Sequence, residues 1–336
     1  MFITSDVSVV IPSFNSRMTI EACLESLLSQ EAAPGEIIVV DSSSDGTSGI
    51  VTRQFPQVKL RQKKKPSFPG PARNYGASKA NGSIIAFIDA DCVAEPDWTR
   101  RIVAWHNQGH QVVGGAITVG NPANPVAWAG HLSEFREFRP IGEPRPVPHI
   151  PTCNISYRKK LIDETGGFPD SYYPQEDLLF NYMLNQKGLQ IWFDPEMQVR
   201  HFCRERLPDF LSHQHRIGRV THSTLLRIEL PGSTVARRAW LAWMVAPLLG
   251  LVKFLRTVPL LHARSAQFQT CPTLSYGSQR FIRLKILALL VLGCLWWGRG
   301  FAAGALKGLS GIHGWNDPDE PFFRLFPTIH EGSKYK

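Results

Sequence analysis

Residues 84–91 read Ile84-Ile85-Ala86-Phe87-Ile88-Asp89-Ala90-Asp91, which is five apolar residues followed by two carboxylates spaced by one residue. A short apolar run of this kind is typical of a buried strand. Two carboxylates just beyond a strand can hold a hard divalent cation, although a solvated acidic turn shows the same pattern. The stretch therefore predicts a buried strand with a candidate metal site at its carboxyl end.

Apolar runs alternate with segments of helical spacing through the first 120 residues. Strands are expected at 7–11, 36–40, 58–61, 84–88 and 112–119, and helices at 18–30, 46–55, 72–80 and 98–108. This order predicts the α/β class, with a mostly parallel sheet that is flanked by helices on both faces.

The residues that follow each strand matter, because such sheets bind ligands at the carboxyl ends of their strands. Pro12-Ser13-Phe14-Asn15 follows the first expected strand, Asp41 the second and Asp89 the fourth. No G-x-G-x-x-G follows the first strand, and no G-x-x-x-x-G-K-[ST] occurs in the chain. Dinucleotide and P-loop sites are therefore disfavoured.

Two more candidate site segments lie further along the chain. A helix expected at 176–186 places Glu176 and Asp177 in its first turn, where the helix dipole favours a carboxylate that can accept a proton. Ordinary charge complementarity at a helix N-terminus is the alternative. His201 ends the second of two short strands expected at 191–193 and 197–201, and it could ligate a metal or be structural. Five prolines at 139–151 predict a flexible flap.

The composition is that of a globular protein. Of 336 residues, 43% are hydrophobic and 19% charged, which excludes a disordered chain, a disulfide-stapled miniprotein and a collagen-like fibre. Six scattered cysteines include no C-x-x-C pair, so a zinc ribbon is not expected and a reducing compartment fits better.

The basic excess lies in the C-terminal part. Residues 231–316 carry ten Lys and Arg and no Asp or Glu, and two stretches within them, 239–252 and 286–298, have no charge. Runs of 14 and 13 residues are shorter than the ~20 of a spanning helix, so helices in the lipid headgroup layer or re-entrant helices fit better. Buried helices of a soluble domain are the alternative. The N-terminus shows no secretory signal.

The combined pattern resembles the family 2 nucleotide-sugar glycosyltransferases of the GT-A fold, over roughly residues 7–219. The segments that carry this resemblance are Val7-Ser8-Val9-Val10-Ile11-Pro12-Ser13-Phe14-Asn15, Glu36-Ile37-Ile38-Val39-Val40-Asp41 with Asp45-Gly46-Thr47, Ala72-Arg73-Asn74-Tyr75-Gly76, Phe87-Ile88-Asp89-Ala90-Asp91 and Gln175-Glu176-Asp177. No single segment is specific, but their order and spacing together are.

The resemblance implies a donor site. Pro12 and Asn15 would line the nucleotide pocket, Asp41 would hydrogen-bond the base, Arg73 would contact the base or the diphosphate, and Asp89 would reach the ribose.

The resemblance also implies the chemistry. Asp91 would bind a divalent cation, Mg²⁺ or Mn²⁺, that bridges the diphosphate, and His201 resembles its partner ligand. Asp177 would be the catalytic base, and Glu176 would help to place the acceptor. Direct attack with one base inverts the anomeric carbon, so the expected activity is that of a metal-dependent inverting hexosyltransferase.

Some residues depart from the family pattern. Phe14 stands where Tyr is frequent, and residues 214–218 do not form the Q-x-x-R-W of processive members. A single transfer is therefore expected rather than polymer synthesis.

The basic, apolar C-terminal part predicts the partners and the location. We expect a lipid-linked or cell-envelope glycan acceptor, binding to anionic lipid, and a position at the cytoplasmic face of the cell membrane. No nucleic-acid partner is expected, because the bases do not lie on the folded body.

The expected organisation is a catalytic domain at 1–230, a membrane-associated helical appendage at 231–316 and a tail at 317–336. Within the catalytic domain, 1–120 would bind the nucleotide sugar and 121–230 the acceptor.

Two rival functions remain open at this point. A nucleotidyltransferase can use a similar sheet and paired aspartates, but it would want a Gly/Arg/Lys-rich loop after the first strand, where only Arg17 is basic. A non-catalytic membrane-bound scaffold that retains the fold is the second rival.

Overall fold

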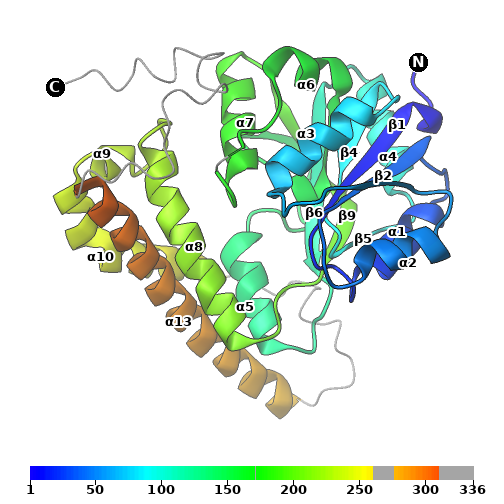
Figure 1. Ribbon diagram of the computed structural model, residues 1–336. Coiled ribbons are helices and arrows are strands. Elements are labelled where there is room, and N and C mark those ends of the chain that lie inside the picture. Colours follow the sequence, from blue (N-terminus) through cyan, green and yellow to red (C-terminus); the bar gives the residue numbers. More distant parts are fainter. Residues whose placement is uncertain (171, 260–275, 310–336) are drawn as a thin grey trace. The chain divides into compact units, whose positions relative to one another are not determined.

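The computed structural model describes residues 1–170, 172–259 and 276–309, with the side chains of 281–307 in the last segment. The chain forms two compact units (Figure 1). One contains residues 1–120 and 138–202, and the other contains 121–137 and the chain from 203 onward. The predicted domain boundary at 230 and this structural division fall at different places. Cys271 and the expected tail lie outside the described residues.

The first unit is built on a nine-stranded sheet, counted over the described residues. The strand order is β3 (Lys59–Gln62), β2 (Glu36–Asp41), β1 (Val7–Ser13), β4 (Ile84–Phe87), β8 (Ile155–Arg158), β6 (Val112–Val119), β9 (Ile191–His201) and β5 (Cys92–Ala94), and β7 (Arg145–Val147) pairs with β9. The pairs among β1–β4 and the β6–β9 pair are parallel, whereas β8, β5 and β7 pair antiparallel. The predicted α/β class is confirmed.

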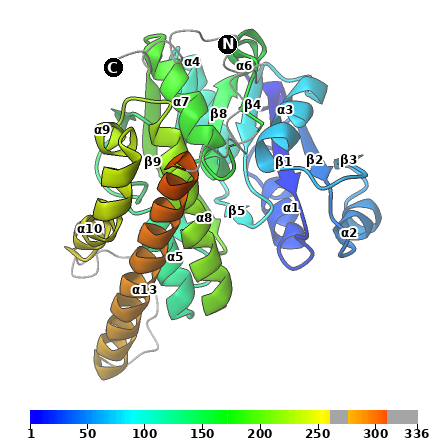
Figure 2. The same ribbon diagram turned by 60° about the vertical axis from the view of Figure 1, so that its left-hand side comes forward.

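Helices flank this sheet (Figures 1 and 2). They are α1 (Ile20–Leu28), α2 (Thr47–Gln54), α3 (Pro69–Lys79), α4 (Trp98–Asn107), α6 (Lys159–Thr165) and α7 (Glu176–Gln186), with short 3-10 turns at Thr4–Asp6 and Thr152–Asn154. The central strands β1, β2 and β4 are buried along almost their whole length, as strands covered on both faces are.

Three predicted boundaries were wrong for identifiable reasons. Strand β1 continues through Pro12 to Ser13. Its pairing with β4 stops at Val10, so no β4 residue needs the backbone N–H that Pro12 lacks. The two short strands expected at 191–201 are one strand, β9, which contains Pro195 in a register shift opposite Gly115 and Ala116. Part of the expected flap at 139–151 is strand β7.

The second unit is helical. It contains α5 (Pro125–Glu134), α8 (Leu207–Leu225), α9 (Ser233–Ala236), α10 (Ala239–Thr257) and α13 (Tyr276–Leu309). Helices α8 and α13 lie side by side in both views (Figures 1 and 2). Their backbones approach closely at glycines, since a Cβ atom added to Gly300 would lie 2.0 Å from the carbonyl oxygen of His215. Helix α5 was not predicted.

The two apolar helices are longer than their charge-free stretches. Among the described residues, 239–257 and 281–307 are long and apolar enough to cross a membrane, a criterion of length and composition alone. Only 17% and 28% of their apolar windows are buried by protein. The expectation that these helices are too short to span was wrong, because both helices continue through flanking bases such as Lys253 and Arg299.

Candidate active site

The carboxyl ends of β1 and β2 form one polar wall of the site. Asp41, the last residue of β2, pairs in register with Ser13 of β1 and is 1% exposed. One of its carboxylate oxygens accepts a hydrogen bond from the Ser43 hydroxyl at 2.5 Å, and the other accepts one from the Ser48 hydroxyl. The carboxylate is therefore held in one orientation by side chains that the sequence did not single out.

Asn15 connects the loops after β1 and β2. Its φ of 54° is in the left-handed region, which Asn tolerates better than most residues. Its backbone N–H donates to the Ser43 hydroxyl at 2.6 Å, and its side-chain oxygen accepts from the Ser44 N–H at 3.1 Å. These bonds make the two loops a single rim, beside which Pro12 is buried in the strand.

Arg73 lies at the centre of the site. This residue of α3 is 3% exposed, and its guanidinium donates to Asp89 at 2.6 Å and to Glu176 at 2.7 Å. A planar guanidinium can serve two carboxylates in this way because its donors are held in a rigid fork. The buried cation thus joins the acidic end of β4 to the first residue of α7. This double ion pair was not predicted, since it connects residues from three separate segments.

Burial raises the pKa of Glu176 to about 7, an effect that Arg73 opposes and the neighbouring Asp177 reinforces. The side chain is 5% exposed and its Oε1 atom is engaged by Arg73. Glu176 is therefore placed to position Arg73 and the start of α7 from within the protein.

Asp177 is the more exposed carboxylate of the pair. Its Oδ2 atom accepts hydrogen bonds from the Thr152 N–H at 3.2 Å and from the Thr152 hydroxyl at 3.4 Å, and its Oδ1 accepts from the Leu178 N–H at 2.7 Å. Backbone donors in the first turn of a helix suit an anionic side chain. Thr152, in the 3-10 turn Thr152–Asn154, was not singled out from the sequence.

The metal-ligand candidates meet where β5 pairs with β9. Cys92 lies opposite His201 in that pairing, and the His201 Nε2 is 3.6 Å from the Asp91 Oδ1. Ligand atoms of Asp91, Cys92 and His201 all lie within 4.8 Å of one another. Mg²⁺ and Mn²⁺ prefer carboxylate oxygen, and imidazole is also an accepted ligand, whereas thiolate suits softer ions. Asp91 and His201 therefore fit a hard cation, and Cys92 fits one poorly.

Arg73 also shows that the separate carboxylates share one neighbourhood. Its guanidinium contacts Asp89, which lies two residues before the candidate metal ligand Asp91. It also contacts Glu176, which immediately precedes the candidate base Asp177. One buried guanidinium therefore joins the segment of the candidate metal ligand to the segment of the candidate base.

A family comparison agrees with this geometry. Residues 8–166 match the family model described as glycosyl transferase family 2. The chain carries a family 2 glycosyltransferase domain. The predicted family is therefore confirmed.

Relatives of this glycosyltransferase include two curated proteins. Glycosyltransferase AglE of Haloferax volcanii is 26% identical over 222 residues, which cover 63% of this chain and 72% of AglE. The succinoglycan biosynthesis protein ExoO of Rhizobium meliloti is 39% identical over 100 residues, only 29% of each chain. The mannosyltransferase PcManGT of Pyrobaculum calidifontis, solved in complex with GDP-Man and Mn²⁺, has a TM-score of 0.55 and 19% identity, and the match covers 92% of this chain and 88% of that chain. The GT-A-type fold is confirmed.

The Arg73 ion pairs give the first prediction. Replacing Arg73 by Gln leaves Glu176 buried without its cation, so the free energy of unfolding is expected to fall by about 3–5 kcal/mol, the range for breaking a buried pair. Urea denaturation followed by circular dichroism measures the change. Donor binding is expected to weaken as well, because Asp89 loses the same partner.

Arg101 offers a matched control in the same unit. Its guanidinium also serves several carboxylates, including Asp97 at 2.7 Å and Asp194 at 2.9 Å, but it is 22% exposed. Arg101→Gln is expected to cost less stability and to leave donor binding unchanged. Equal stability and equal donor binding for the two variants would contradict the central role of Arg73.

Proposed function

We propose that this glycosyltransferase moves a sugar from a nucleotide-diphosphate donor to an acceptor hydroxyl with inversion at the anomeric carbon. The observation that supports this proposal most directly is the double ion pair of Arg73 with Asp89 and Glu176. It joins the segment of the cation ligand Asp91 to the helix turn that carries the potential base Asp177. A nucleotidyltransferase or a non-catalytic scaffold is disfavoured by the family match and by this complete acidic set.

The proposed donor subsite is the rim of Pro12, Asn15 and Asp41. Asp41 would accept hydrogen bonds from the nucleotide base, and Asp89, partly exposed and held by Arg73, would reach the ribose. Arg73 itself is proposed to act on the donor through Asp89, because its guanidinium is buried and engaged by two carboxylates.

The proposed chemistry needs one base. Asp91 and His201 would hold Mg²⁺ or Mn²⁺, which would act as a Lewis acid toward the departing diphosphate. Asp177 would take the proton of the acceptor hydroxyl as that oxygen attacks the anomeric carbon. Because a single direct displacement inverts the configuration, an α-linked donor would give a β-linked product. Glu176 would fix the helix turn from which Asp177 extends.

The proposed acceptor is lipid-linked or part of a cell-envelope glycan, and each encounter would transfer one sugar. The two long apolar helices, largely uncovered by protein, support attachment to the membrane. Bases of the second unit would favour anionic lipid. The name of ExoO, a succinoglycan biosynthesis protein, agrees with a polysaccharide product. The cytoplasmic face is proposed because nucleotide sugars are donors and the cysteines described are all free.

Metal dependence is the second prediction. Purified full-length protein incubated with UDP-, GDP- or dTDP-sugars is expected to release nucleoside diphosphate slowly in the presence of Mn²⁺ or Mg²⁺. Chelation with EDTA is expected to abolish release, and added Mn²⁺ to restore it. Release of pyrophosphate from a nucleoside triphosphate instead would indicate nucleotidyl transfer, and no turnover or binding of any nucleotide sugar would indicate the scaffold.

Membrane attachment is the third prediction. The full-length protein is expected in the membrane pellet after a wash with about 1 M salt, where the Debye length falls to about 3 Å and purely ionic attachment is lost. Detergent should release it. Recovery of all the protein in the soluble fraction would contradict the proposal. Protease should digest the first unit in inside-out vesicles but not in right-side-out vesicles if that unit faces the cytoplasm.

A further inference from the structure

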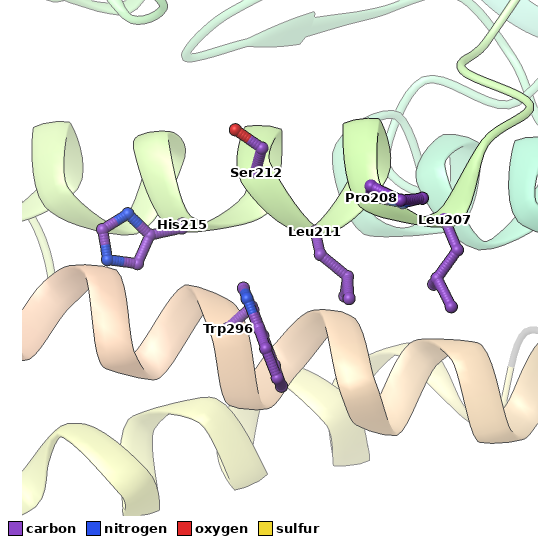
Figure 3. A pocket seen from close by; sticks show the side chains of 6 residues that line it. All are labelled: Leu207, Pro208, Leu211, Ser212, His215 and Trp296. Atoms are coloured by element: carbon purple, nitrogen blue, oxygen red, sulfur yellow. The ribbon is translucent and has the colours of Figure 1, made fainter.

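A groove runs between α8 and α13 in the second unit, and none of the residues that line it belongs to the candidate active site. It has a volume of about 500 Å³, within the range of small-molecule sites. The residues that line it are Leu207, Pro208, Leu211, Ser212, His215 and Trp296. Leu207 and Leu211 extend from α8 toward α13, and Trp296 lies on α13 (Figure 3). Leu207 and Trp296 are each 36% exposed, so the groove presents apolar surface.

One end of the groove is cationic. The glycine contacts set the helices side by side in the same direction, with Gly300 against His215 and Gly304 against Arg219. Arg299, which precedes Gly300 and is exposed, therefore lies near His215. Arg219 lies four residues beyond His215 on α8, so the two residues share one face of that helix. Burial lowers the pKa of His215, and the positive charges of Arg219 and Arg299 lower it further.

We infer that this groove binds one molecule of a phosphate-bearing lipid, with its hydrocarbon chain along Leu211 and Trp296 and its phosphate at Arg219 and Arg299. The two ends of the groove match the two ends of such a molecule. Guanidinium groups bind phosphate with charge-assisted hydrogen bonds, and the apolar end removes a chain from water. The inference rests on the proposed membrane attachment, not on the sugar transfer.

The surroundings favour a lipid over other occupants. Apolar residues of α13 that neighbour Trp296 in the sequence remain exposed, such as Leu295 at 54%. Residues 281–307 of the same helix are apolar enough to cross a membrane. A lipid could therefore enter the groove from the bilayer along α13 without passing through water.

Native mass spectrometry of the full-length protein in detergent tests the inference directly. Dioctanoyl phosphatidic acid is expected to bind once per chain, and about tenfold more tightly than dioctanoyl phosphatidylcholine. Trp296→Ala is expected to weaken binding of both lipids. Arg299→Gln is expected to weaken only phosphatidic acid, by about fivefold, the value for one basic contact near a lipid phosphate.

Matched controls come from α10. Trp243 is 50% exposed and Arg256 is exposed, and neither lines the groove. Trp243→Ala and Arg256→Gln are expected to bind both lipids like the unchanged protein. Equal loss in these variants would overturn the inference, as would equal affinity for the two lipids.

Two other outcomes would assign the groove to a different occupant. Displacement of the lipid by millimolar inorganic phosphate alone would identify a site for free phosphate. A dimer that is lost in Trp296→Ala would identify a second copy of the chain. Because lipid binding is measured without donor or acceptor, failure here leaves sugar transfer untouched, and an inactive enzyme that still binds the lipid leaves the groove assignment untouched.

Discussion

Replacing Asp177 by Asn is expected to lower the rate of sugar transfer by about 10²–10⁴-fold, the usual contribution of a general base. The amide keeps the size of the side chain and can still accept a hydrogen bond from Thr152, but it cannot take a proton from the acceptor. Initial rates of nucleoside diphosphate release in the presence of acceptor give the measurement. Near-normal turnover would remove Asp177 from this role.

Donor binding separates a catalytic loss from a misfolded site. Calorimetry with the Mn²⁺ complex of the donor is expected to give the same dissociation constant for Asp177→Asn and the unchanged protein, because Asp177 is proposed to act on the acceptor. Glu176→Gln is a useful companion variant. It is expected to lower the rate less, since Glu176 positions the helix turn through Arg73 and its Oε1 contact. A larger loss for Glu176→Gln than for Asp177→Asn would exchange the two roles.

Replacing Asp91 by Asn is expected to lower the metal-dependent rate by about 10²–10³-fold, as loss of several kcal/mol of Lewis-acid stabilisation would. The variant removes a charged ligand beside His201, the residue 3.6 Å away. In a titration with Mn²⁺, the variant should reach half-maximal activity at a higher Mn²⁺ concentration and should have a lower maximal rate. An unchanged Mn²⁺ titration would place the cation elsewhere.

Cys92 provides the control for the metal site. Its sulfur lies 3.9 Å from the Asp91 Oδ1 and belongs to the same group of potential ligand atoms. Cys92→Ala is expected to retain the Mn²⁺ titration, because a hard cation does not need the thiol. A loss equal to that of Asp91→Asn would make Cys92 a ligand and would point to a softer metal.

Local patterns were sufficient to predict much of the fold. The bounds of β6 and α7 agree with those expected from the sequence, because a β-branched run and a Pro-led acidic turn mark these elements within a few residues. The extension of β1 through Pro12 was not predictable, since it depends on where the neighbouring strand β4 ends. The single strand β9 depends in the same way on a register shift opposite β6.

The candidate site was predictable as a set of residues but not as a set of contacts. Strand ends pointed to Asp41 and Asp89, and both lie at the carboxyl ends of the parallel strands, as the general rule requires. The partners of these residues were not evident. Arg73 was expected at the nucleotide but is buried between two carboxylates, an arrangement that only the packing of α3 against the sheet and α7 creates.

Because Arg73 forms ion pairs with two acids, substitutions at these three positions are expected to be coupled in evolution. Losing either acid would leave an excess positive charge in the interior, and losing the arginine would leave excess negative charge. Among descendants of this chain, Arg73, Asp89 and Glu176 should therefore be retained or replaced as a trio, even though they are scattered along the gene.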